Sequence, residues 1–210
     1  MRPGTSIGIP IPGSMKVGCL FGSFDPPHKG HIAIAEHMLK VCHLEQVWLV
    51  VTPQNPFKQD RELSPDQHRL AMVRLAVQGK EGLAASGFEI DLPRPSYTAD
   101  SFRFMRRRWP DHEFSLIIGS DNLATLHTWK DPEEILEHHK LCVYPREGMK
   151  DHLAATIYHG HPGVRIVADA PMLNVSSTGI RADLKAWRTV EGKVRPRVLH
   201  YIREHRLYQS

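Results

Sequence analysis

The sequence has few cysteines and no long apolar run, and both absences narrow the class of protein. Only three cysteines occur in 210 residues, and their spacing shows no paired metal-ligand pattern: Cys19, Cys42 and Cys142. No apolar run approaches the roughly 18 residues that a transmembrane helix needs. Residues 1–14 contain Pro, Gly and Ser but lack the apolar centre of a signal peptide. We therefore expect free thiols in a reducing cytoplasm and no membrane partner.

Strong charge, internal repeats and low-complexity tracts are also lacking. The formal net charge is only +4, with a pI near 9.0, which suits anionic ligands such as nucleotides. A chain of this length is typical of one domain. We expect residues 1–14 to be a disordered N-terminal extension and residues 15–210 to form that domain. The residue pattern specifies no oligomeric state.

The two commonest phosphate-binding patterns, Gly-x4-Gly-Lys-Ser/Thr and Gly-x-Gly-x-x-Gly, do not occur. Instead, the string GSFDPPHKGH covers residues 22–31. It follows an apolar run at residues 17–21 that reads as a buried strand, and it precedes a run of helical period from residue 32 to residue 42. A turn of this kind, from a strand into a helix N-terminus, is where α/β proteins bind phosphates.

Two histidines distinguish this string from a generic turn. His28 and His31 are three residues apart and share one face of a first helical turn, so both imidazoles can donate to a reacting phosphate. We expect Gly22 to allow a tight turn and Gly30 to let a ligand approach the backbone. The alternative is a proline-stiffened turn with two solvated histidines, which suits an isolated His-x-Gly-His better than the whole string.

The rest of the chain alternates between strand and helix patterns. We expect further strands at residues 45–51, 83–92, 114–118, 139–144 and 164–167, the last at an edge. Helices lie between them, and one around residues 198–202 packs on the sheet. This alternation predicts an α/β fold with a doubly wound, Rossmann-like parallel sheet and C-terminal helices, whose ligands bind at the carboxyl ends of the strands.

Helix starts are signalled by capping residues. Ser64 is the expected N-cap of the helix that begins at Pro65, and Asp131 precedes Pro132 in the same way. In the stretch 175–181, Ser177 or Thr178 can cap a helix whose spare N–H groups could hold a phosphate. Arg181 lies in the first turns of that helix, where a cation opposes the helix dipole, so an anion nearby is expected.

Polar side chains follow several of the expected strands, and each has a plainer alternative. Lys58 can bind phosphate or lie solvated in a surface loop. Asp121 can bind a ribose or an adenine amino group, or cap a helix. Trp129 can stack on a ring or fill the core.

A cluster of arginines and a cluster of histidines could suggest binding sites, but neither is assigned one. Four arginines between residues 103 and 108 suggest a nucleic-acid surface, but a solvated helix face is the better reading, so a nucleic-acid partner is disfavoured. His152, His159 and His161 match no standard zinc spacing, and no protein metal ligand is assigned.

The string at residues 22–31 resembles the signature of the HxGH nucleotidyltransferase superfamily. Four further stretches resemble bacterial nicotinate-nucleotide adenylyltransferases: NPFK at 55–58, PSYTADS at 95–101, FSLIIGSDNLATLHTW at 114–129 and VSSTGIR at 175–181. The resemblance runs from Lys16 to about Tyr208. It implies transfer of AMP from ATP to nicotinate mononucleotide, with release of pyrophosphate and formation of deamido-NAD.

The resemblance also implies residue roles. It assigns the ATP phosphates and the transition state to His28, His31 and Arg181. It assigns further ATP contacts to Gly22, Ser23, Phe24, Gly119, Asp121, Ser177 and Thr178. It places the acceptor nucleotide against Asn55, Lys58, Tyr97, Thr98, Trp129 and Arg146. Mg²⁺ would bridge the leaving phosphates, held mainly by ATP and water, with Asp25 as an additional ligand.

Three alternatives remain open at this point. Nicotinamide mononucleotide or 4′-phosphopantetheine could replace nicotinate mononucleotide as the acceptor. A non-catalytic protein that binds nucleotides or RNA could also be built on this fold, although an intact histidine pair argues against it.

Overall fold

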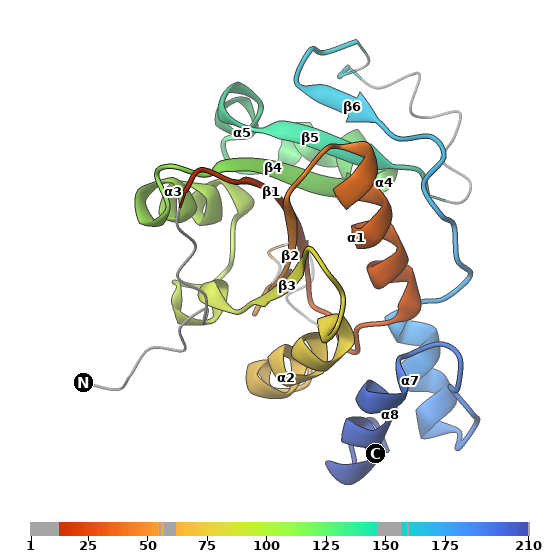
Figure 1. Ribbon diagram of the computed structural model, residues 1–210. Helices are drawn as coiled ribbons and strands as arrows, with labels where there is room; N and C mark the ends of the chain where they lie inside the picture. The colour runs from red at the N-terminus through yellow and green to blue at the C-terminus, as the bar shows by residue number, and fades with distance from the viewer. Residues whose placement is uncertain (1–12, 55, 57–61, 147–156, 159, 210) are drawn as a thin grey trace.

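A six-stranded parallel sheet forms the centre of the computed structural model, which describes residues 13–54, 56, 62–146, 157–158 and 160–209 (Figure 1). The strands are β1 (Lys16–Gly22), β2 (Gln46–Val51), β3 (Leu83–Ser86), β4 (Glu113–Gly119), β5 (Lys140–Tyr144) and β6 (Val164–Ile166). Their order is β3-β2-β1-β4-β5-β6, and every neighbouring pair is parallel. The expected doubly wound sheet is confirmed, with β6 at an edge. No helix among the described residues is long and apolar enough to cross a membrane.

Helices cover both faces of the sheet because its strands are apolar on both sides. The helices are α1 (Lys29–Val41), α2 (Asp66–Val77), α3 (Thr98–Arg108), α4 (Ser120–Thr125), α5 (Pro132–His138), α7 (Ser177–Lys185) and α8 (Pro196–Glu204), with short 3-10 helices η1 (Phe88–Asp91) and η2 (Leu126–Thr128). One core joins the sheet to α1, α2, α7 and α8, and a second joins it to α3, α4 and α5.

The strand order places a crevice between β1 and β4. These strands are neighbours, but β1 leads into α1 on one face of the sheet and β4 leads into α4 on the other. In an open parallel sheet, ligands bind at the point where two neighbouring strands lead to helices on opposite faces of the sheet. The fold therefore brings the ends of β1 and β4, at Gly22 and Gly119, to one ligand-binding edge.

Several local expectations were wrong. The third strand ends at Ser86 and continues as η1 rather than as a strand to residue 92. Ser64 does not cap α2: the N-cap is Pro65, and the Ser64 carbonyl accepts a hydrogen bond from Arg69 instead. Asp131 precedes α5 as expected, but its carboxylate binds Arg103 rather than the helix terminus. The main partner of α8 is α2 rather than the sheet.

A fully buried arginine ties the loops at the ligand-binding edge together. Arg69 donates from Nη1 to the carbonyls of Ser23 and Thr52 at 2.7 and 2.8 Å. Its Nε donates to the Ser64 carbonyl at 2.9 Å, and Nη2 contacts the Asp66 carboxylate. Because these groups follow β1, follow β2 and precede α2, one guanidinium fixes three segments relative to one another.

We predict that Arg69→Met lowers the free energy of unfolding by about 3 to 5 kcal/mol, because it leaves buried carbonyls without donors and a carboxylate without its partner. Urea unfolding followed by circular dichroism measures this change. Arg74 lies exposed on the same helix, and Arg74→Met should change the free energy by less than about 0.5 kcal/mol. Equal effects of the two substitutions would contradict the role of Arg69.

Candidate functional site

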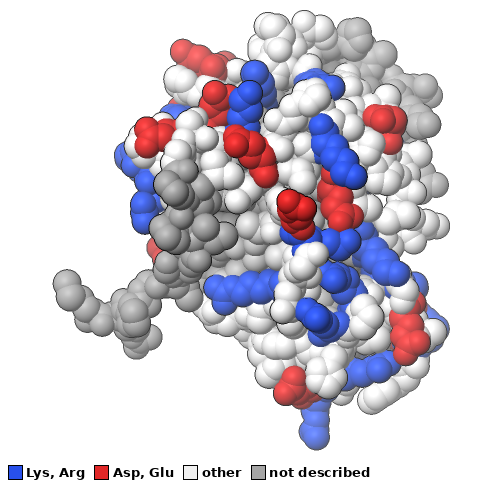
Figure 2. All heavy atoms as spheres, viewed as in Figure 1, with Lys and Arg blue, Asp and Glu red and all other residues white. Residues whose placement is uncertain are grey.

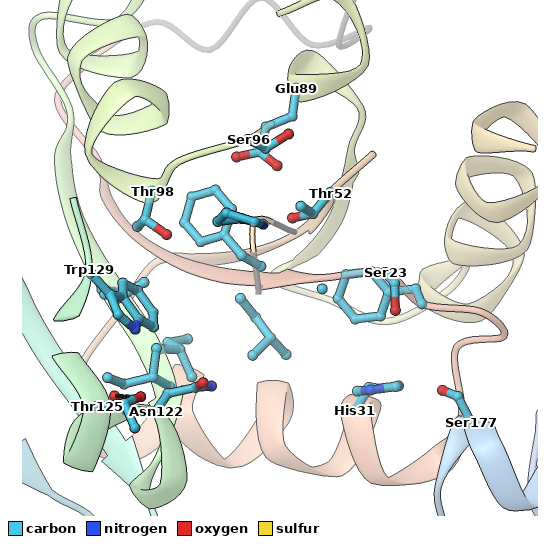
Figure 3. Close-up of a pocket in the computed structure, with 18 of the residues that line it drawn as sticks. Ser23, His31, Thr52, Glu89, Ser96, Thr98, Asn122, Thr125, Trp129 and Ser177 are labelled. Atoms are coloured by element: carbon cyan, nitrogen blue, oxygen red, sulfur yellow. Dashed lines mark hydrogen bonds between the residues drawn. The ribbon is translucent and has the colours of Figure 1, made fainter. Parts of the chain in front are cut away.

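A pocket of about 520 Å³ lies at the carboxyl edge of the sheet and is lined by most of the predicted site residues (Figure 3). Those that line it are Gly22, Ser23, Phe24, His28, His31, Tyr97, Thr98, Trp129, Arg146, Ser177 and Thr178. Gly119, Asp121 and Arg181 do not line it. Asn55 and Lys58 lie outside the described residues. Segments that are up to about 150 residues apart in sequence therefore meet at one pocket, as expected for the ends of parallel strands.

The two histidines stack on each other at the start of α1. Their ring centroids are 3.6 Å apart, and the Phe24 ring meets His31 edge-on at 5.0 Å. The His28 backbone N–H donates to His31 Nδ1 at 3.2 Å. Because Nδ1 of His31 accepts this hydrogen bond, the proton of a neutral His31 ring lies on Nε2. His31 is therefore held as a donor through Nε2.

Burial keeps both histidines neutral. Burial lowers the pKa of His28 to about 4, with a further contribution from the positive charge of Arg146. It lowers the pKa of His31 well below 6.5, and His28 and Arg146 act in the same direction. At neutral pH the pair therefore offers N–H donors that carry no charge.

Two glycines in this motif lie close to the rings of its own side chains. A Cβ on Gly22 would lie 3.1 Å from the Phe24 ring, and a Cβ on Gly30 would lie 3.0 Å from the His28 ring. Phe24 itself is almost fully buried and has a φ of +48°. The absence of a side chain at these two positions therefore makes room for the motif's own rings, and Gly22 also lines the pocket.

The corner at residues 25–26 is held from the C-terminal part of the chain. Ser177 Oγ donates to the Pro26 carbonyl at 2.9 Å, and Arg181 Nη1 donates to the Asp25 carbonyl at 2.6 Å. Tyr208 donates to the Asp25 carboxylate at 2.5 Å. The partner of the Arg181 guanidinium at this corner is thus a neutral backbone carbonyl. The N-cap of α7 is Ser176, which accepts from the Gly179 N–H, rather than Ser177 or Thr178.

Asp25 does not suit a role as a magnesium ligand. Its side chain is 1% exposed, contacts Tyr208 and the Ser64 N–H, and does not line the pocket. Across the described part of the chain, no group of three or more His, Cys, Asp or Glu side chains could hold a metal. Two of the three histidines considered for zinc, at positions 152 and 159, lie outside that part.

Arg146 forms the boundary between the pocket and the end of β4. Its Nε lies 3.5 Å from Asp121 Oδ1, and its guanidinium lies 5.6 Å from the centre of the Tyr144 ring. A Cβ on Gly119 would collide with the Asp121 carboxylate and lie 3.1 Å from Arg146. The absence of a side chain at Gly119 thus permits Asp121 and Arg146 to approach each other. Gly119 is also the N-cap residue of α4, so Asp121, which we considered for that position, lies in the first turn of the helix instead.

The opposite wall of the pocket comes from the start of α3 and from the segment after β4. Trp129 is partly buried against the second core and also lines the pocket, so both of its expected roles are possible at once. Tyr97 is the N-cap of α3, and Lys130 lies 5.0 Å above its ring. Figure 3 shows Trp129, Asn122 and Thr125 gathered on one side of the pocket.

Sequence reasoning missed three buried polar residues of the pocket, Thr52, Glu89 and Ser96. Ser96 lies within the motif at 95–101, and Thr52 immediately follows β2, so both had a positional signal. Glu89 had none, because it lies in a stretch that we expected to be a strand.

The sequence matches the cytidylyltransferase-like family over residues 19–183. The chain belongs to this family.

Two relatives that align with nearly the whole chain are named for the same activity. A probable nicotinate-nucleotide adenylyltransferase of Flavobacterium johnsoniae is 42% identical over 196 residues, which cover 93% of this chain and 100% of the relative. That of Salinibacter ruber is 36% identical and covers 93% of this chain and 98% of the relative. These relatives place the chain in the nicotinate-nucleotide adenylyltransferase branch of the cytidylyltransferase-like family.

Solved structures confirm the fold of this family member. The nicotinic acid mononucleotide adenylyltransferase of Plasmodium falciparum complexed with NaAD has a TM-score of 0.75, is 16% identical, and covers 92% of this chain and 97% of its own. A putative nicotinate-nucleotide adenylyltransferase of Vibrio parahaemolyticus has a TM-score of 0.69, is 18% identical, and covers 93% of this chain and 96% of its own.

Two of the four arginines in the cluster on α3 form ion pairs within the protein. Arg103 pairs with Asp100, Asp131 and Glu134, and Arg106 pairs with Glu134. On the face shown in Figure 2, basic side chains lie among acidic ones rather than in one continuous field. These pairs favour the structural interpretation of the cluster.

We predict that the ring signals of His28 and His31 do not titrate between about pH 5.5 and about pH 8 in NMR spectra, because burial holds both pKa values below that range. The substitutions His28→Gln and His31→Gln assign the two signals. A midpoint near 6.5 for either motif histidine would contradict this prediction.

Proposed function

We propose that the protein transfers AMP from ATP to nicotinate mononucleotide and releases pyrophosphate. The observation that carries this proposal is the neutral histidine pair at the head of α1, in a pocket of about 520 Å³ between β1 and β4. The names of the relatives, at up to 42% identity over nearly the whole chain, support the choice of acceptor. The pocket volume lies within the ordinary range for small-molecule sites.

The chemistry needs no protein nucleophile. A phosphate oxygen of the acceptor attacks the α-phosphorus of ATP, a new P–O bond forms, and the bond to the pyrophosphate oxygen breaks. Catalysis then consists of positioning and of stabilising the charge that develops on the phosphate oxygens. We assign this stabilisation to the N–H groups of His28 and His31.

The remaining roles follow the arrangement of the pocket. Ser177 and Thr178, at the start of α7, are assigned to the outer phosphates of ATP together with Arg181. The adenosine is assigned to the end of β4, at Gly119 and Asp121, and the first motif contributes Gly22, Ser23 and Phe24. The acceptor is assigned to Tyr97, Thr98, Trp129 and Arg146, with Asn55 and Lys58 from the loop after β2. Mg²⁺ enters with ATP, held by its phosphates and by water.

A cytoplasmic location is part of the same proposal. Cys19, Cys42 and Cys142 are all free thiols in this structure. Free thiols persist in a reducing compartment, which is also where ATP is abundant.

We predict that His31→Ala lowers kcat by about 100-fold or more while the fold is retained, because it removes a donor to the transition state. Pyrophosphate release with ATP, Mg²⁺ and nicotinate mononucleotide measures kcat, and circular dichroism measures the fold. His127→Ala, on an exposed residue outside the pocket, is the matched control and should retain full activity. Full activity of His31→Ala would remove this residue from the mechanism.

The same assay distinguishes the alternative acceptors. Turnover with 4′-phosphopantetheine alone would contradict the proposed acceptor class. Tight RNA binding that weakens with salt, without turnover of any acceptor, would favour the non-catalytic alternative.

We predict that Arg181→Ala raises the KM for ATP by about tenfold, as expected for the loss of one charge-assisted hydrogen bond worth about 1.5 kcal/mol. Steady-state kinetics with ATP varied at saturating acceptor provides the measurement. Arg188→Ala is the control, because Arg188 is exposed and pairs only with Asp183 among the described residues. If both variants keep the wild-type KM, Arg181 does not contribute to the triphosphate site.

A further inference from the structure

One part of the pocket is lined by three buried polar side chains from three different segments. Glu89 lies on η1, Ser96 lies before α3 and Thr52 follows β2, and they are 1%, 9% and 6% exposed. All three line the pocket. In Figure 3 they lie together on the side of the pocket opposite His31 and Ser177, and Thr98 is next to them. We refer to Thr52, Glu89 and Ser96 as the polar recess.

The polar recess has hydrogen-bonding capacity that the protein does not use. Glu89 Oε1 accepts a hydrogen bond from the Ser101 hydroxyl on α3. Glu89 Oε2 and Ser96 Oγ are buried and have no hydrogen-bond partner of good geometry among the described residues. Buried polar atoms are nearly always satisfied in folded proteins, because an unsatisfied one is costly. Two such atoms on residues that line one pocket point to a polar group of a ligand.

Glu89 can present either of its protonation states near neutral pH. Burial raises the pKa of its carboxyl group to about 7, and the hydroxyls of Ser101 and Thr52 offset part of this rise. The Cys19 thiol on β1 also lies near Glu89, and its pKa is raised by burial and by the charge of Glu89. From α2, Arg69 contacts the Thr52 carbonyl but is paired with Asp66. A neutral Glu89 can donate to a ligand, and an ionised Glu89 can only accept.

We propose that the polar recess binds the carboxyl substituent on the pyridine ring of the acceptor, directly or through one water molecule. This inference rests on the proposed function and adds the group that distinguishes nicotinate from nicotinamide. The triphosphate of ATP lies at the histidine end in the proposed arrangement, which leaves the opposite side for the acceptor ring. An unsubstituted ring there would leave the buried oxygens unsatisfied, whereas a carboxyl group satisfies them.

The protonation state of Glu89 then determines which acceptor is preferred. A neutral Glu89 donates its proton in a hydrogen bond to the nicotinate carboxylate, and no covalent bond changes. An ionised Glu89 repels that carboxylate and instead accepts from the amide of nicotinamide. Glu89 is therefore a specificity-determining residue rather than a participant in phosphoryl transfer.

The test compares the wild type with Glu89→Gln, which keeps an acceptor for Ser101 but cannot ionise. The KM values for nicotinate mononucleotide, nicotinamide mononucleotide and ATP are measured from about pH 5.5 to about pH 8.5. In the wild type we expect the KM for the nicotinate compound to rise about tenfold across pH 7, as expected for about 1.4 kcal/mol of like-charge repulsion. Glu89→Gln should flatten this rise, and the KM for ATP should not change.

The control and a second variant keep the result interpretable. Glu113→Gln changes an exposed carboxylate at the start of β4, outside the pocket, and should behave as the wild type. Ser96→Ala removes the second unsatisfied oxygen and should raise the KM for both pyridine nucleotides several-fold. It also tests the polar recess if Glu89→Gln does not fold.

The possible outcomes separate this inference from the proposed function. A wild type that turns over nicotinate mononucleotide with the same pH profile as Glu89→Gln overturns the polar recess and leaves the function intact. A change in the KM for ATP alone would place the recess against ATP and overturn the inference as well. A wild type without turnover of either pyridine nucleotide at any pH overturns the proposed function itself.

Discussion

The buried guanidinium of Arg69 is the interaction on which the ligand-binding edge depends. A parallel sheet leaves its carboxyl ends as separate loops, each free to take its own path. Arg69 supplies donors in a fixed planar fork, and it uses them on carbonyls that follow β1 and β2 and precede α2. A lysine has neither the number of donors nor the geometry for this task. Through Asp66 the same network reaches Arg94, which lies in the segment that leads into α3.

Burial shapes the chemistry of the pocket more than charge does. The two histidines and Glu89 are all pushed toward their neutral forms by desolvation, although one type is a base and the other an acid. Among the charged groups, Arg146 lies at the boundary of the pocket, Lys130 pairs with Asp100, and Arg181 donates to a backbone carbonyl. The neutral N–H donors of the histidine pair can bind the phosphate oxygens of a ligand without changing their own charge.

The fold could be read from the sequence because its signals are local and repeated. Apolar runs of strand length, followed by helical periods, predicted all six strands and their parallel arrangement. Residues that line the pocket within motifs, such as His28 and Thr98, were found for the same reason. The errors arose where a tertiary contact replaced a local one, as at Ser64, whose carbonyl Arg69 uses, and at Ser177, whose hydroxyl binds Pro26. Glu89 could not be found, because nothing near it in sequence marks a buried carboxyl that lines a pocket.

The hydrogen bond from Tyr208 to Asp25 joins residues that are 183 positions apart. Contacts between residues so far apart in sequence form slowly, because the entropy of closing the intervening loop must be overcome first. The corner that precedes the histidine pair is therefore braced by a residue that is synthesised 183 positions after it. A chain that ends before Tyr208 lacks the hydroxyl that binds the Asp25 carboxylate, so this brace is absent while the chain is being made.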